Sequence, residues 1–419
     1  MTINMGLASA SDSPRENPRD DELGHAYYAE KIADALFKLN PKDSYSVSIN
    51  APWGSGKTTF ANFILHYMKE KDEDQKLIFI RFDPWLYSST DQIINYFMSE
   101  VIKEVSRVHA VGKNLNKAMS ILREANKIIA ERDDVPFWAK LGLTTLTFDW
   151  TSLRRSDLIT LFGEVCSSLE RADKRLLILV DDIDRLDQNE CQMVLTAIKA
   201  IGKLPKTIYL ILCDMEIVGR MIKAYNPSVV SGHEYLKKIV QFQFDLPATE
   251  SPRLKSYFFK RFEGLFDRRS DCHEICQQIN IFFDAYQYSV EELFPFLLDT
   301  PRAVVRLINA LSLTYRPIWD EIDTLDFLLL EILRLDHPEL YEAIRDSYFD
   351  LLENPYQDIK QSSPDMKNHS GEDLLGVDLI DRCLNECTDK DRRILHIILM
   401  FLFPKYVYLY QYIHLNICQ

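Results

Sequence analysis

The residue types best suited to binding phosphate lie together in one run, Pro52-Trp53-Gly54-Ser55-Gly56-Lys57-Thr58-Thr59. Glycines let successive backbone N–H groups curl around a phosphate, and a helix that begins there adds the positive end of its dipole. Lys57 is expected to reach the β- and γ-phosphates of a nucleotide, and the Thr58 hydroxyl to bind Mg²⁺. Ala51 replaces the first glycine of the common pattern, a mild departure because the Gly-Ser-Gly-Lys-Thr core is intact. We predict that the whole run contacts the nucleotide.

Two acidic residues, Asp181 and Asp182, follow an unbroken apolar run from Leu176 to Val180. Asp181 ends this predicted strand and suits Mg²⁺ coordination, directly or through a water molecule. Asp182 lies where many ATPases have an acidic residue that polarises the attacking water. An acidic turn after a strand is common by itself, so this interpretation depends on its pairing with the phosphate-binding run. Together the two motifs predict a nucleoside triphosphate hydrolase.

Short apolar runs alternate with helical patterns and would position both motifs. The predicted strands are Tyr45–Ile49, Leu77–Phe82, Leu176–Val180, Ile208–Leu212 and Val240–Phe244. The predicted helices between or before them include Ala26–Leu39, Lys57–Lys69 and Asn189–Ile201. This alternation predicts an α/β fold with a parallel sheet flanked by helices. The extra strand between the two motifs favours the ASCE/AAA-like branch of P-loop NTPases, in which the P-loop and Walker B strands are not neighbours.

The chain divides by pattern into four parts. Residues 1–20 are polar and are expected to form a flexible arm, and residues 21–250 form the α/β core. A helical insertion is expected at about 91–170, and helical patterns dominate residues 251–419. Within the last part, residues 354–372 are predicted to form a loop.

Composition excludes several classes of protein. The 419 residues are 47% hydrophobic and 27% charged, which is ordinary for a globular protein. The net charge of −14 argues against non-specific binding to nucleic acid or anionic lipid. Eight scattered cysteines are too dilute for a disulfide framework. There is no secretory signal and no apolar run of about 18 residues, so we expect a cytoplasmic protein with no membrane contact.

The sequence resembles the KAP P-loop NTPases, and in particular their soluble bacterial members. The segments that carry this resemblance are Asp21-Glu22-Leu23-Gly24, Pro52-Trp53-Gly54-Ser55-Gly56-Lys57, Arg81-Phe82-Asp83-Pro84-Trp85, Asp181-Asp182-Ile183-Asp184-Arg185, Glu234-Tyr235-Leu236-Lys237-Lys238-Ile239 and Thr300-Pro301-Arg302 with Arg306 and Asn309. They follow one another in order over residues 20–310. The resemblance implies an ATP-binding module with Mg²⁺, followed by an α-helical lid.

Further roles follow from the resemblance. Asp214 would read the γ-phosphate, or is a plain strand-end residue. Arg185 would act as an arginine finger on a neighbouring protomer, or as a salt-bridge partner of Asp184. Arg302 and Arg306 would contact the nucleotide from the lid, or are solvated helix charges.

The same family sets three further expectations. Trp85 is expected to be a core aromatic residue rather than a ligand contact. Many members have membrane-spanning helices between the Walker motifs, whereas the insertion here is too polar or too short. The family usually has more helical chain after Leu402-Phe403-Pro404, so the end at Gln419 suggests a truncated form.

The predicted function is an ATP- and Mg²⁺-dependent ATPase whose cycle drives a conformational change. Bacterial relatives resemble phage-exclusion components, which implies a role in anti-phage defence with protein partners and self-association. One alternative is a slowly hydrolysing switch or scaffold that recruits partners, and a less favoured one is an ATPase that remodels nucleic acid. The absence of an Asn-Lys-x-Asp motif favours ATP over GTP.

Two weaker patterns are set aside. Cys272-His273-Cys276 lacks the second ligand pair of a zinc site, and Cys383 with Cys387 has the same spacing. The basic and aromatic residues from Arg253 to Arg261 favour an amphipathic helix over a nucleic-acid surface.

Overall fold

The computed structural model describes most of the α/β core and most of the helical region. The described ranges are 11–86, 169–201, 204–227, 231–266, 271–285, 293–315, 317–347 and 375–404, with single helical residues between 93 and 105 and residue 167. Most of the predicted insertion at 91–170 and the predicted loop at 354–372 lie outside them. The chain forms two compact units, which we call the α/β unit (13–249) and the helical unit (1–12 and 250–419).

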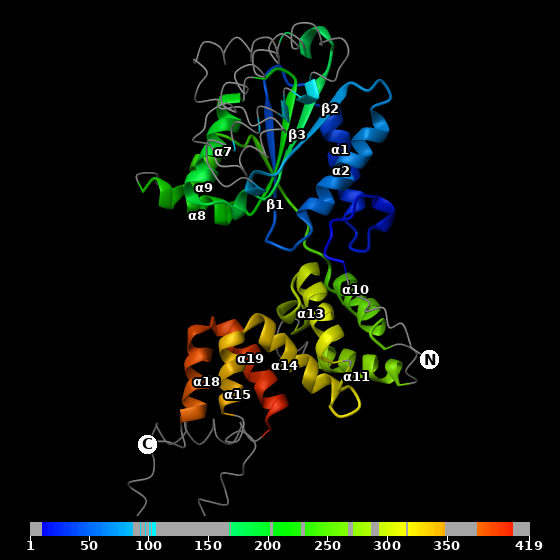
Figure 1. The fold of residues 1–419 in the computed structure, drawn as a ribbon, viewed down its shortest axis with the longest axis vertical. Helices are drawn as coiled ribbons and strands as arrows, with labels where there is room; N and C mark the ends of the chain where they lie inside the picture. The colour runs from blue at the N-terminus through cyan, green and yellow to red at the C-terminus, as the bar shows by residue number, and fades with distance from the viewer. Residues whose placement is uncertain are drawn as a thin grey trace, which may run out of the picture. The chain divides into compact units, whose positions relative to one another are not determined.

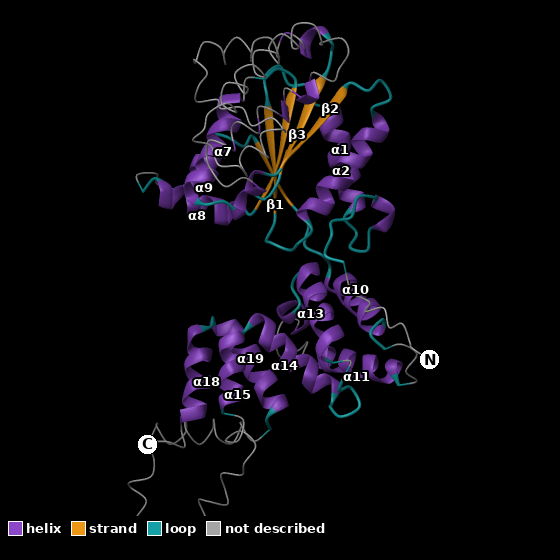
Figure 2. Ribbon diagram, viewed as in Figure 1, coloured by secondary structure: helices purple, strands orange, loops and turns teal. Residues whose placement is uncertain are grey.

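A parallel five-stranded sheet forms the centre of the α/β unit (Figures 1 and 2). Its strands are β1 (Tyr45–Asn50), β2 (Leu77–Phe82), β3 (Arg175–Val180), β4 (Thr207–Cys213) and β5 (Phe242–Asp245). Their order is β2-β3-β4-β1-β5, and every pairing is parallel. The predicted fold class is therefore confirmed. β4 separates the P-loop strand β1 from the Walker B strand β3, although the sequence suggested β2 for the extra strand.

Helices cover the two faces of this sheet (Figure 1). The α/β helices are α1 (Ala26–Lys38), α2 (Lys57–Lys71), α7 (Gln188–Ile201), α8 (Met215–Tyr225) and α9 (Gly232–Leu236). α1 and α2 pack together on one face, and α7, α8 and α9 lie on the other. Alternate residues of β3 supply the two cores: Leu177 faces α1 and α2, whereas Ile178 faces the opposite side. A strand buried on both faces must be apolar throughout, which explains its unbroken run.

Part of the arm predicted as flexible, residues 13–20, belongs to the α/β unit and has defined contacts there. The backbone N–H of Arg15 donates to the hydroxyl of Thr59 at 3.1 Å, and its carbonyl accepts from Asn62 at 3.1 Å. A short 3₁₀ helix, η1, spans Pro18–Asp20. Asp21 then accepts three backbone N–H groups just before α1. Part of the predicted arm is thus hydrogen-bonded to α2, the helix that begins at Lys57.

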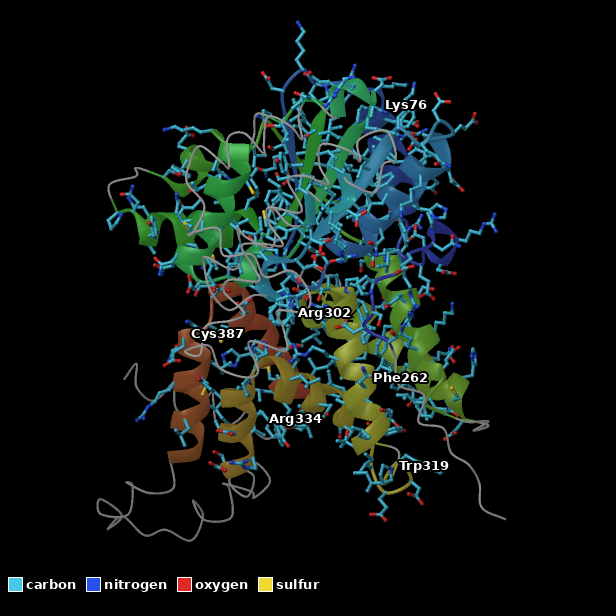
Figure 3. The ribbon with its side chains drawn as sticks, turned by 45° about the horizontal axis from the view of Figure 1, so that its top comes forward. Lys76, Phe262, Arg302, Trp319, Arg334 and Cys387 are labelled. Atoms are coloured by element: carbon cyan, nitrogen blue, oxygen red, sulfur yellow. The ribbon has the colours of Figure 1, made fainter. Side chains whose placement is uncertain are left out.

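The described part of the helical unit contains helices and no strand (Figure 2). Its helices are α10 (Ser251–Glu263), α11 (Cys272–Ala285), α12 (Leu293–Leu297), α13 (Pro301–Thr314), α14 (Thr324–Asp336), α15 (Pro338–Asp346), α18 (Leu375–Glu386) and α19 (Asp389–Leu402). One apolar core joins them, and it includes Phe258 and Phe262 of α10. Figure 3 labels Phe262. The basic and aromatic pattern of Arg253–Arg261 therefore belongs to an amphipathic helix that packs on this core. Among the described residues, no helix combines the length and apolar character that a membrane crossing requires.

Candidate nucleotide-binding site

The phosphate-binding loop joins β1 to α2 through two glycines in the left-handed region. Gly54 has φ +86° and Gly56 has φ +93°, which side-chain-bearing residues rarely adopt. Lys57 is the first residue of α2, so the free N–H groups of this helix begin at the loop. The N–H of Ala51 donates to the carbonyl of Cys213, which fixes the base of the loop to β4. The local geometry is that of an anion-binding turn.

Lys57 lies beneath this loop with its ammonium group almost fully enclosed. Its side chain is 7% exposed, and Nζ donates to the carbonyls of Ala51 at 2.8 Å and Pro52 at 3.3 Å. A third contact, at 3.4 Å, goes to Oδ2 of Asp184, whose side chain is 3% exposed. Sequence reasoning considered Asp184 only as a partner for Arg185. The spacing of the motifs gave no signal for this lysine–aspartate pair.

The two predicted metal-binding residues are in direct contact. The Thr58 hydroxyl donates to Oδ2 of Asp181 at 3.0 Å, although 123 residues separate them. Arg81, at the end of β2, donates to the same oxygen at 3.2 Å and also pairs with Asp83. Arg81 was part of the family motif but had no predicted role. The structure gives Arg81 a role as a partner of Asp181, because β2 and β3 are parallel neighbours and their carboxyl ends lie side by side.

The carboxylates at the end of β3 are perturbed by burial. Burial, reinforced by the nearby charge of Asp182, raises the pKa of Asp181 to about 6. Burial also raises the pKa of Asp182, and the guanidinium of Arg185 opposes this shift. Buried, mutually repelling carboxylates suit a site that receives a cation.

Asp182 and Arg185 form a pair of their own. Arg185 Nε contacts Oδ1 of Asp182 at 3.1 Å, so the expected alternative of a bridge from Arg185 to Asp184 is wrong. The cause is the 3₁₀ turn η4 (Ile183–Arg185), which directs Asp184 inward to Lys57 and leaves Arg185 beside Asp182. Asp182 itself has φ +57°, a conformation that costs a non-glycine residue about 1 kcal/mol or more.

Trp85 is partly exposed, so a second expectation is wrong. We expected a core aromatic residue, but 48% of Trp85 is exposed, and the guanidinium of Arg185 lies 5.3 Å from its ring centre. The residue follows the carboxyl end of β2, in the 3₁₀ turn η2 (Pro84–Leu86). Its side chain therefore positions Arg185 instead of filling the core.

Other residues predicted to touch the nucleotide have partners of their own. The carboxylate of Asp214 caps α8 by accepting the N–H groups of Glu216 and Ile217. The Thr59 hydroxyl accepts from Arg15, as described above. Trp53 is half exposed at the loop.

Arg302 and Arg306 both lie on α13 of the helical unit (Figure 3 labels Arg302). Arg302 Nε contacts both carboxylate oxygens of Asp12, at 2.9 and 3.1 Å. Arg306 pairs with Asp336 at 3.7 Å and donates to the carbonyl of Leu335. Both arginines therefore have partners within the helical unit.

Most of the chain matches the model of one protein family. A model described as the KAP family P-loop domain matches residues 25–318. This chain belongs to the KAP family of P-loop NTPases. The matched range includes the phosphate-binding loop, the acidic end of β3 and both arginines of α13, so the resemblance seen in the sequence is confirmed.

One curated relative and several solved structures are similar to this KAP protein. The phage T7 exclusion protein of Escherichia coli (strain K12) is 24% identical over 352 residues, which cover 79% of this chain and 47% of the relative. The chain thus spans about half the length of that relative. The ORC2 protein of Aeropyrum pernix in its ADP form has a TM-score of 0.40 at 12% identity, covering 94% of this chain and 97% of that one. A Walker-type ATPase of Pyrococcus abyssi has a TM-score of 0.40 at 12% identity, with coverages of 93% and 99%.

The cysteine pattern set aside in the sequence lies within one helix. Cys272 and Cys276 both lie on α11, and no group of three or more potential His, Cys, Asp or Glu ligands occurs among the described residues.

Proposed function

We propose that this KAP protein binds ATP with Mg²⁺ and hydrolyses it, and that the cycle drives a conformational change. The observation that carries the proposal is the contact between Thr58 and Asp181 at 3.0 Å, beside a buried lysine at the loop. Mg²⁺ prefers oxygen ligands, and a hydroxyl and a carboxylate at this distance suit one ion. The perturbed carboxylates at the end of β3 fit the same cation.

The proposed binding roles follow from these positions. The loop from Pro52 to Thr59 would wrap the phosphates, and Lys57 would pair with their β- and γ-oxygens. Thr58 and Asp181 would hold Mg²⁺, which when bound offsets charge on the phosphates. Asp214 remains a proposed contact near the γ-phosphate, although its carboxylate caps α8.

The proposed catalytic residues are Lys57, Asp182 and Arg185. Asp182 would accept a hydrogen bond from the attacking water and orient it, and its strained backbone supports a functional role. Arg185, held by Asp182 and Trp85, would offset charge on the transferring phosphoryl group. The same residue could instead serve a neighbouring protomer.

The helical unit is the proposed lid. Arg302 and Arg306 would contact the nucleotide by exchanging their partners Asp12 and Asp336 for phosphate oxygens. Such an exchange would couple the helical unit to the nucleotide. This coupling is the proposed conformational output.

The proposed biological role is anti-phage defence in the cytoplasm, with protein partners and self-association. It is supported by the similarity to a phage exclusion protein over 79% of this chain. Phage plaque counts on cells that carry the intact gene or its Lys57→Ala variant test it. Equal counts in the two strains would reject a nucleotide-dependent defence role.

A slowly hydrolysing switch is the second candidate, and one contact favours it. Arg185 pairs with Oδ1 of Asp182, so this oxygen would be less available to accept a hydrogen bond from the attacking water. Single-turnover and steady-state hydrolysis of ATP, with and without Mg²⁺, separate the two candidates. Repeated turnover supports the motor, one slow hydrolysis per binding event supports the switch, and no hydrolysis rejects both. Addition of DNA or RNA to the same assay tests nucleic-acid remodelling, which the net charge of −14 disfavours.

A further inference from the structure

Asp184 joins three segments of the α/β unit through one buried carboxylate. Its Oδ2 accepts the backbone N–H of Asp214 at 2.9 Å and contacts the ammonium of Lys57 at 3.4 Å. Its Oδ1 is buried and has no hydrogen-bond partner among the described residues. The carboxylate thus lies between the phosphate-binding lysine and the start of α8.

The start of α8 is also hydrogen-bonded to β1, the strand that leads into the phosphate-binding loop. Asn50, the last residue of β1, accepts the N–H of Met215 at 2.9 Å. The carboxylate of Asp214 is used on the first turn of α8 itself. Asp184, and not the side chain of Asp214, is therefore the acidic group in contact with both Lys57 and α8.

A shift at the start of α8 would pass to α9. A Cβ added to Gly232 of α9 would lie 1.9 Å from the carbonyl oxygen of Gly219 in α8. Backbones in such close contact leave no space for one helix to move freely past the other. Tyr235 of α9 also accepts from Gln192 of α7 at 2.9 Å, so the helices on this face form one connected layer.

We propose that Asp184 is a positioning residue that transmits the state of Lys57 to α8. This inference rests on the proposed function, since it requires a nucleotide phosphate to attract the lysine. In this structure, Asp184 shares the ammonium group of Lys57 with the carbonyls of Ala51 and Pro52. When phosphate oxygens attract that ammonium group, Asp184 becomes a buried anion with a weakened counter-charge, which is unfavourable. The remaining donor is the N–H of Asp214 at the positive end of α8, so the carboxylate and the first turn of α8 draw together.

Hydrogen–deuterium exchange on the full chain tests this directly. The probe is a non-hydrolysable ATP analogue with Mg²⁺, and the measured segments are the phosphate-binding loop and the residues from Asp214 to Ile217. In the wild type, we expect the analogue to protect the loop and to slow exchange of the Asp214 amide about fivefold.

Two matched substitutions separate transmission from binding. Asp184→Asn keeps the size and an acceptor for Asp214 but removes the charge. We expect its loop to remain protected by the analogue while the change at Asp214 disappears. Asp187→Asn makes the same substitution three residues later, at an exposed residue whose Oδ1 accepts from Glu190 and which is in no contact with Lys57 among those described. It should respond like the wild type.

Each outcome has one meaning. Absence of loop protection in the wild type would reject the proposed function, and the inference with it. Loop protection without a change at Asp214, or an Asp184→Asn protein that responds like the wild type, would reject the inference alone. If circular dichroism shows that Asp184→Asn does not fold, Asp184→Glu replaces it. The Asp184→Glu variant keeps the charge, so we expect the analogue still to slow exchange of the Asp214 amide. If Asp187→Asn alone lost this slowing of exchange, the inference would also be overturned.

Discussion

Several charged residues at the carboxyl edge of the α/β sheet are buried, whereas the two arginines of α13 in the helical unit pair with partly exposed carboxylates. Asp181 and Asp184 are at most 3% exposed, and their partners come from three other segments. The pair of Arg306 and Asp336 is 47% and 35% exposed. Exposed pairs contribute about 0–1 kcal/mol, but a buried charge left without its partner costs several kcal/mol. The same residue types therefore constrain the molecule to different degrees, and substitutions should reveal that difference.

Lys57→Ala should have the largest effect. It removes the charge proposed to pair with the phosphates, and charge-assisted hydrogen bonds of about 1.5–3 kcal/mol each imply an affinity loss of about 10²-fold. Isothermal titration with ATP and Mg²⁺ measures it. Lys71→Ala, on the same helix but paired with Asp34, is the control and should bind normally. Unchanged affinity in Lys57→Ala would reject the phosphate-binding assignment, provided that thermal unfolding shows a folded protein despite the unpaired Asp184.

Asp182→Asn should separate binding from hydrolysis. The substitution removes a proton acceptor but not a proposed phosphate ligand, so ATP should still bind while the hydrolysis rate falls by about 10²–10⁴-fold. Asp181→Asn should instead weaken the dependence on Mg²⁺, measured as the Mg²⁺ concentration at half-maximal rate. If both variants hydrolyse ATP like the wild type, the acidic end of β3 is not the catalytic site.

Arg185→Ala should have an intermediate effect. Loss of one charge-assisted contact predicts a rate about 10–100-fold lower, whereas loss of an arginine finger predicts about 10³-fold or more. Because Arg185 contacts Asp182 of its own chain, we expect no recovery when Arg185→Ala is mixed with Lys57→Ala. Recovery that rises with protein concentration would show instead that Arg185 acts in a neighbouring protomer.

Arg302→Ala should have the smallest effect on the affinity for ATP. The arginine must first release Asp12, so its net contribution to ATP affinity should be below about tenfold. Titration against Arg253→Ala, an exposed control that pairs with Glu250 on α10, measures the difference. Equal affinities in the two variants would remove Arg302 from the nucleotide site. If Arg302→Ala lowered the affinity for ATP as much as Lys57→Ala, the contrast between the buried charges of the α/β unit and the exposed pairs of the helical unit would not hold.

The sequence predicted the parts of the site that depend on local pattern. The phosphate-binding loop could be located because glycines, a lysine and a threonine at fixed spacing serve one geometry. Asp181 could be paired with Thr58 because parallel strands end at a common edge. The alternation of strands and helices also gave the fold class, since a strand buried on both faces must be apolar.

Only the tertiary structure decided which charged groups share a partner. Asp184 and Arg185 are adjacent in sequence, yet the turn η4 directs one to Lys57 and the other to Asp182. No spacing rule states the direction of a side chain in a 3₁₀ turn. A bridge between these two neighbours was therefore one of two alternatives for Arg185, and the structure pairs Arg185 with Asp182 instead. Arg81 was seen only as a motif residue and Trp85 was expected in the core, but the contacts of both depend on the position of β2 beside β3. Apolar pattern and local spacing were enough to predict the fold class and the phosphate-binding loop of this protein. The pairing of its buried charges depended on strand order and turn geometry, which bring distant residues together.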